Sequence, residues 1–147
     1  MITLILIFDK KELIVGVAHA GWKGAVKGIT DNLIERFQMN GSLIENILVA
    51  IGPCIGKDSF EVKSDMIKAC IKEDCLSERF FINKSNSDFF DLGGYLVKKL
   101  QNKGLKFIDH IDEDTFKNSE KFFSHRRETK KNNPTTGRMI NIIGLTK

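Results

Sequence analysis

Two apolar runs at the start of the chain constrain its fold more than any other feature. Residues 2–8 (ITLILIF) and 13–18 (LIVGVA) are almost entirely apolar, and only the charged residues 9–12 separate them. Apolar runs of this length beside a polar turn are typical of buried strands. The first run is too short to cross a bilayer, and no small-residue cleavage site follows it. The pair predicts two neighbouring buried strands joined by a hairpin-like loop, and no association with a membrane.

The rest of the chain alternates between helical and strand-like patterns. Apolar residues recur at helical spacing over residues 26–37, 60–71 and 92–100, and strand-like runs occupy residues 47–51, 105–108 and 139–145. The 147 residues, of which 41% are hydrophobic, suffice for one core. Adjacent opening strands argue against a purely parallel sheet. We therefore expect a single domain over residues 1–147, of the α/β (α+β layered) class, with mixed β-sheets flanked by helices.

Composition narrows the class of protein and its compartment. A charged fraction of 29% with this apolar content excludes a disordered chain and a membrane-embedded one. Three cysteines at no framework spacing, without an export signal, predict free thiols and a cytoplasmic location. The net charge of +4 is interleaved except over residues 117–131, where the excess of cations could attract a phosphate or nucleotide. Without a stacking ladder or a known motif, we expect no nucleic-acid binding.

The first segment with site-like chemistry is residues 19–24 (HAGWKG), at the end of the second predicted strand. It places an imidazole at a strand end and two glycines in a turn, with Trp22 and Lys23 before a predicted helix. Ligands of α/β proteins bind at such junctions, where free N–H groups and the helix dipole favour anions. A single histidine also often has a structural role. Both interpretations of His19 stay open at this point.

A second segment, residues 52–56 (GPCIG), opens a glycine-bounded loop after the third predicted strand. Cys54 at its centre could be a nucleophile activated by His19, because an adjacent imidazole lowers the pKa of a thiol. Alternatively, Cys54 is a small buried side chain that fills space in the turn.

A third segment, residues 122–127 (FFSHRR), is followed by residues 136–138 (TGR). Two aromatic residues anchor a loop that presents the hydroxyl of Ser124, an imidazole, and the guanidinium groups of Arg126 and Arg127, with Arg138 further along. Guanidinium groups bind phosphate or carboxylate through paired hydrogen bonds. Ion pairs with nearby carboxylates are the alternative use of these arginines.

These segments, in this order, resemble the multicopper polyphenol oxidase or laccase-domain family, and the resemblance covers almost the whole chain. It implies a cytosolic enzyme of purine nucleoside metabolism with a bound zinc. The implied reactions are phosphorolysis of adenosine, inosine, guanosine and methylthioadenosine, and deamination of adenosine. Purine nucleosides and phosphate are the implied partners. The implied fold is a layered arrangement of mixed sheets that also resembles a toxin deamidase domain with a Cys-His pair.

The resemblance also implies that the chain is the C-terminal portion of the family's fold, with an incomplete zinc site. The family's zinc is held by two histidines and a cysteine, and only His19 matches. The family's cysteine would fall at about Ile2, and its other histidine precedes Met1. Because a catalytic zinc normally has three protein ligands, His19 alone would not hold it. Other donors in the chain are Cys54, His110 and His125. A missing N-terminal part would leave the opening strand at a sheet edge, where self-association is expected.

Three hypotheses follow for function. The first is a purine nucleoside phosphorylase, or a fragment of one, with His19 as catalytic residue and metal ligand. Trp22, Lys23 and Ser124 would then bind substrate, and Arg126, Arg127 and Arg138 would receive phosphate or ribose. The second is a non-catalytic remnant or interaction module that has lost its metal. The third is a hydrolase that uses Cys54 and His19.

Overall fold

A four-stranded mixed sheet forms the centre of the protein. The computed structural model describes residues 2–133 and 135–146. Strands β1 (Ile2–Asp9), β2 (Ile14–Gly21), β3 (Ile47–Ile51) and β7 (Phe107–His110) lie in the order β2-β1-β3-β7. β1 runs antiparallel to β2 and β3, and β3 runs parallel to β7. The predicted hairpin and mixed sheet are confirmed. The opening strand is interior, however, and β2 and β7 are the edge strands of this sheet, so the expectation that β1 lies at a sheet edge was wrong.

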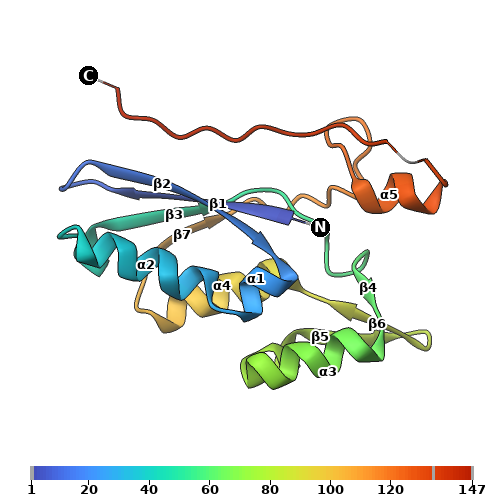
Figure 1. Cartoon of the computed structure of the whole chain (residues 1–147). Coiled ribbons are helices and arrows are strands. Elements are labelled where there is room, and N and C mark those ends of the chain that lie inside the picture. Colours follow the sequence, from blue (N-terminus) through green and yellow to red (C-terminus); the bar gives the residue numbers. More distant parts are fainter. Residues whose placement is uncertain (1, 134, 147) are drawn as a thin grey trace.

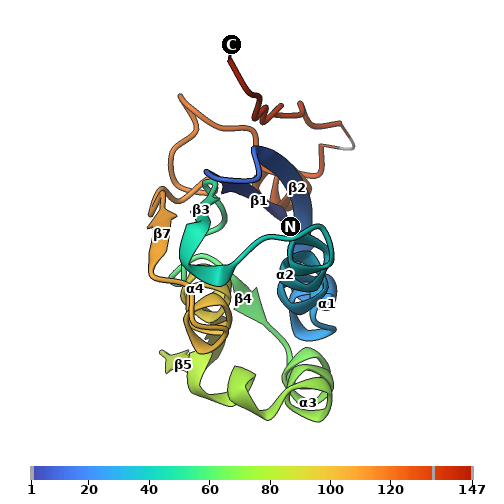
Figure 2. The same cartoon turned by 90° about the vertical axis from the view of Figure 1, so that its left-hand side faces the viewer.

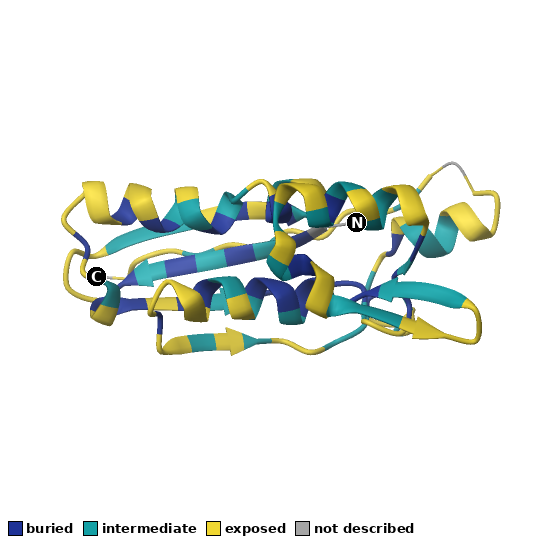
Figure 3. Ribbon diagram, turned by 90° about the horizontal axis from the view of Figure 1, so that it is seen from below, coloured by how far each residue is buried: buried dark blue, intermediate teal, exposed yellow. Residues whose placement is uncertain are grey.

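Two helices, α2 (Ile29–Met39) and α4 (Leu92–Asn102), cover one face of this sheet (Figures 1 and 2). Buried and exposed positions alternate along both helices (Figure 3), as amphipathic helices require. On β1, Ile5 and Ile7 are fully buried. The core that they begin continues through Ile47, Ile51, Phe90, Leu92, Tyr95, Leu96 and Leu100.

The first predicted helix is in fact two. α1 (Trp22–Val26) precedes α2, and Gly28 between them has a φ of 87°. This left-handed conformation, which glycine adopts without a steric penalty, interrupts the α-helix and redirects the chain. The short α1 therefore begins immediately after β2, which places Trp22 and Lys23 at the strand–helix junction.

A smaller antiparallel sheet was not predicted. It contains β4 (Glu61–Val62), β6 (Ser87–Phe90) and β5 (Phe81–Lys84), in that order. The predicted helix over residues 60–71 begins only at α3 (Ser64–Glu73), because the chain before it pairs with β6. A two-residue turn with positive φ at both Ser85 and Asn86 joins β5 to β6.

The predicted final strand over residues 139–145 is wrong, because this segment has no strand structure. It crosses the face of the large sheet opposite the helices (Figures 1 and 2). The hydrogen-bonding groups of a sheet lie in its plane, so a segment over the face meets side chains and no free strand edge. Ile143 accordingly lines a groove with Leu6 and Phe8, whereas Ile140 and Ile142 are more than 80% exposed. Within the described residues, no helix has the length and apolar character to cross a membrane.

Candidate functional site

A cavity of about 480 Å³ forms where β1 and β2 meet the C-terminal third of the chain. His19 lies on β2 opposite Leu4 of β1, and both line the cavity. The loop after β3 contributes Pro53 and Ile55 to the wall. The start of helix α5 (His125–Lys130) and the segment around Arg138 complete the enclosure. Parts of the chain more than a hundred residues apart in sequence therefore share one cavity.

Four of the residues singled out from sequence motifs meet in this cavity, namely His19, Ser124, His125 and Arg138. Ser124 is buried and caps α5, where its hydroxyl accepts a hydrogen bond from the backbone N–H of Arg127 at 3.3 Å. His19, His125 and Arg138 are exposed. The Arg138 Nη1 atom donates to the backbone carbonyls of Thr136 and Gly137, at 2.9 and 3.4 Å, and the rest of its guanidinium group remains for a ligand. Among the described residues, no carboxylate lines the cavity. An arginine and two imidazoles without an opposing carboxylate favour an anion.

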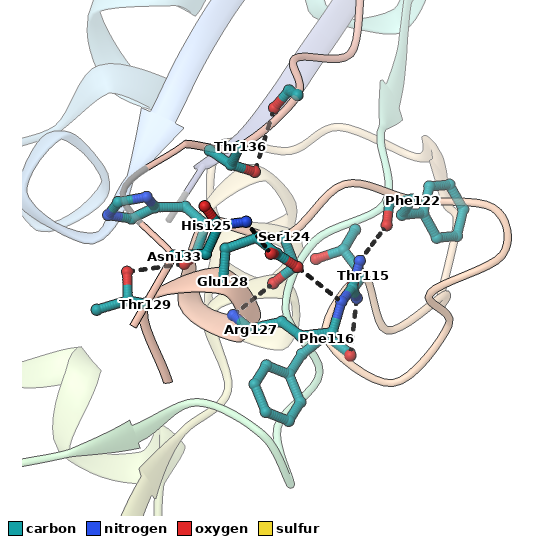
Figure 4. Close-up of polar contacts among 11 residues, drawn as sticks. Thr115, Phe116, Phe122, Ser124, His125, Arg127, Glu128, Thr129, Asn133 and Thr136 are labelled. Carbon is teal, nitrogen blue, oxygen red and sulfur yellow. Dashed lines mark hydrogen bonds and ion pairs between the residues drawn. The ribbon is translucent and has the colours of Figure 1, made fainter. Parts of the chain in front are cut away.

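Arg127 positions the loop through the contacts drawn in Figure 4. It is not among the residues that line the cavity. Its guanidinium group donates hydrogen bonds to the backbone carbonyls of Thr115, Phe116 and Phe122, at 2.8, 2.9 and 2.6 Å. The side chain is 14% exposed. Figure 4 shows the His125 ring pointing away from this network. Arg127 therefore fixes the start of α5 against the preceding loop, a structural use of a residue that was predicted to bind substrate.

Asp114 stabilises the same region and does not itself line the cavity. Its carboxylate accepts hydrogen bonds from the Ser59 hydroxyl at 2.6 Å and the Phe116 backbone N–H at 2.9 Å. Burial raises the pKa of this carboxyl, but the hydrogen bonds outweigh burial, and the pKa lies below its ordinary value. A Cβ atom at Gly56 would lie 2.6 Å from the Asp114 Oδ2 atom, so this close approach requires glycine. The neighbouring Thr115 lines the cavity, a position that no sequence motif predicted.

Cys54 lies outside the cavity, and its surroundings oppose a nucleophilic role. Its side chain is 5% exposed. Burial, with the negative charges of Asp91, Asp112 and Asp114, raises the pKa of its thiol to about 12. A nucleophilic cysteine needs a thiolate at neutral pH, which requires a lowered pKa. The structure therefore favours the space-filling role of Cys54 over the Cys-His hydrolase.

Trp22 and Arg126 line a second cavity, of about 500 Å³, whose wall also includes residues of α5. Arg126 donates a hydrogen bond from Nη2 to the backbone carbonyl of Glu61 at 3.0 Å. Lys23 lies over the Trp22 ring, with its ammonium nitrogen 5.5 Å from the ring centroid. His125 lines both cavities. Of the residues predicted to bind substrate, Ser124 and Arg138 line the first cavity and Trp22 and Arg126 line the second. Lys23 and Arg127 line neither.

The donor set does not fit a zinc ion held by this chain alone. Among residues 2–133 and 135–146, no three His, Cys, Asp or Glu side chains lie close enough together to bind a metal. His19 and His125 share a cavity, but a catalytic zinc normally has three protein ligands.

Comparison with known proteins decides the family. The model of the multi-copper polyphenol oxidoreductase laccase family matches residues 3–146. The chain belongs to this family. This laccase-domain chain is 35% identical over 141 residues to a purine nucleoside phosphorylase of Rickettsia prowazekii. The aligned residues make up 95% of this chain and 58% of that protein. It is 34% identical to the purine nucleoside phosphorylase YfiH of Escherichia coli over 131 residues, 89% of the chain and 51% of that protein.

Solved structures agree with the family's fold. The hypothetical protein YfiH of Bacillus licheniformis is 28% identical and superposes with a TM-score of 0.79, over 87% of this chain and 50% of that one. A protein of the DUF152 family from Neisseria meningitidis is 26% identical, with a TM-score of 0.76, over 86% of this chain and 51% of that one. The laccase-domain chain therefore spans about half the length of the relatives that it matches.

Proposed function

We propose that this laccase-domain chain contributes the His19–His125–Arg138 cavity to a purine nucleoside phosphorylase. The observation that carries the proposal is the meeting of these three side chains in one cavity without an opposing carboxylate. An anionic co-substrate such as phosphate needs a cation and hydrogen-bond donors in a partly enclosed site. The names of the relatives in Rickettsia prowazekii and Escherichia coli support the same reaction class.

The reaction would be displacement at the anomeric carbon of the ribose. A phosphate oxygen forms a bond to C1′ while the bond from C1′ to the purine nitrogen breaks. The purine leaves with the electron pair and takes a proton from solvent. In this scheme Arg138 neutralises charge on the phosphate, and the imidazoles of His19 and His125 hold phosphate and ribose oxygens by hydrogen bonds. Positioning and charge neutralisation are the contributions that such a site makes to the rate.

The test is release of hypoxanthine and ribose 1-phosphate from inosine in the presence of phosphate. Zinc is included because the family resemblance implies it. We expect base release that depends on phosphate and falls at least tenfold in Arg138→Met, because the cavity loses its only arginine among the described lining residues. The Escherichia coli relative, assayed in parallel, is the positive control. No base release at high protein concentration, with the relative active, would contradict the proposal and favour a non-catalytic module.

A further inference from the structure

The cavity that contains Trp22 has the walls of a site for a flat aromatic ligand. It lies between the start of α1, the strand β4, the first turn of α3 and the helix α5. Trp22 is partly exposed, and Phe60 and Met66 line the same space. Aromatic side chains stack on nucleobases, because every base has a flat π-face. A volume of about 500 Å³ is within the range of small-molecule sites.

Polar groups of both signs surround this aromatic floor. Arg126 and Lys63 supply donors, and Glu61 and Asp65 supply carboxylate acceptors. The Arg126 side chain is one-third exposed, and its Nη2 atom is 4.0 Å from the Glu61 Oε2 atom. This is longer than a hydrogen bond, so the two side chains do not satisfy each other. A purine presents ring-nitrogen and carbonyl acceptors together with N–H donors on one planar ring. A mixed set of donors and acceptors around an apolar floor suits that pattern better than it suits an anion.

The two cavities adjoin at His125, which lines both. In phosphorolysis the purine leaves from one side of the ribose and phosphate attacks from the other. Two cavities of different chemistry that share one wall residue match these two requirements. The cavity with Arg138 and His19 suits phosphate, whereas the cavity with Trp22 suits an aromatic ring.

We infer that the Trp22 cavity binds the purine base of the nucleoside while the ribose lies beside His125. This inference rests on the proposed phosphorolysis, since that reaction makes the cavity with His19 and Arg138 the phosphate site. It explains why Trp22 and Arg126 lie apart from Arg138 although all three were predicted to bind substrate. Trp22 is thereby a base-stacking residue, and Met66 is an apolar part of the same cavity wall.

The experiment uses Trp22 as its own reporter, because it is the only tryptophan in the chain. Hypoxanthine is titrated into the protein while tryptophan fluorescence is recorded, with N-acetyltryptophanamide as the control for light absorption by the base. We expect saturable quenching by hypoxanthine and none by inorganic phosphate. Absence of quenching up to the solubility of hypoxanthine would overturn the inference.

A matched pair of variants separates binding in this cavity from quenching elsewhere. Met66→Arg places a long cationic side chain in the Trp22 cavity, whereas Met39→Arg makes the same change at a position that is 80% exposed at the end of α2. We expect Met66→Arg to weaken hypoxanthine binding at least tenfold and Met39→Arg to leave it unchanged. Equal affinities in the two variants, with native circular dichroism, would also overturn the inference.

The outcome is separable from that of the proposed function. If inosine is cleaved but hypoxanthine does not quench Trp22, phosphorolysis stands and the base binds elsewhere. If hypoxanthine quenches Trp22 saturably but no base is released from inosine, the cavity binds purines and the phosphorylase proposal fails.

Discussion

Replacement of Arg127 by methionine tests whether this residue builds the site through the backbone. The change removes three hydrogen bonds, to the backbone carbonyls of Thr115, Phe116 and Phe122. These carbonyl oxygens then lose the donor that Arg127 provides. Hydrogen bonds from a charged group contribute about 1.5–3 kcal/mol each, and neighbouring losses are not additive. We therefore expect Arg127→Met to lower the free energy of unfolding by roughly 3–5 kcal/mol.

The assay is urea denaturation followed by circular dichroism, supported by thermal melts. A loss of this size corresponds to a fall in Tm of roughly 10 °C for a domain of this length. Arg36→Met is the matched control, because Arg36 is exposed on α2 and should change stability by no more than about 0.5 kcal/mol. If the two variants unfold at the same urea concentration, Arg127 does not hold the loop, and the structural role assigned to it is refuted.

Two further predictions concern titratable groups that are buried or partly buried. Iodoacetamide should modify exposed Cys75 readily and Cys54 only after unfolding, because Cys54 is buried and burial raises the pKa of its thiol. Mass spectrometry of the peptides measures the labelling rates of both cysteines. Rapid labelling of Cys54 in the folded protein would contradict this prediction. Burial raises the pKa of Asp74, but hydrogen bonds from Tyr95 at 2.7 Å and Lys99 at 3.0 Å outweigh burial and lower it. The stabilisation that the Asp74 carboxylate provides is therefore complete above the unfolded-state pKa of about 3.9 and is lost as the pH falls through the lower folded-state pKa. Asp74→Asn should destabilise the protein at pH 7 and should flatten the loss of stability in acid. Equal stability profiles of the two proteins in acid would contradict this.

The sequence predicts those parts of the fold that depend on local patterns. The hairpin of β1 and β2 follows from two apolar runs around a charged turn, and α4 follows from its helical periodicity and Gly104 beyond its end. The small sheet was missed because its strands are short and its turn is Ser85–Asn86, without the Asn-Gly signal of such hairpins. The segment 139–145 has a strand-like composition but lies over a sheet face, where its backbone meets no strand edge.

The candidate site, like the fold, was predicted from the sequence only in part. Residue types in the motifs indicated a site for an anion, and His19, Ser124 and Arg138 do meet. Sequence could not show that Arg127 turns inward to backbone carbonyls, because that depends on where residues 115–122 lie. Nor could it show that α5 contributes to the walls of two cavities. Such divisions arise from tertiary packing, which local patterns do not encode.

The three histidines provide the most direct test of the central claim. His19 and His125 line the cavity with Arg138, and His110 lies outside it beside Gly93. Imidazole resonances in ¹H–¹³C NMR spectra, assigned with single His→Gln variants, are followed while ribose 1-phosphate is added. We expect the resonances of His19 and His125 to shift together and saturably, and those of His110 to stay in place. Shifts confined to His110, or no saturable shift at His19 and His125, would contradict the proposed site.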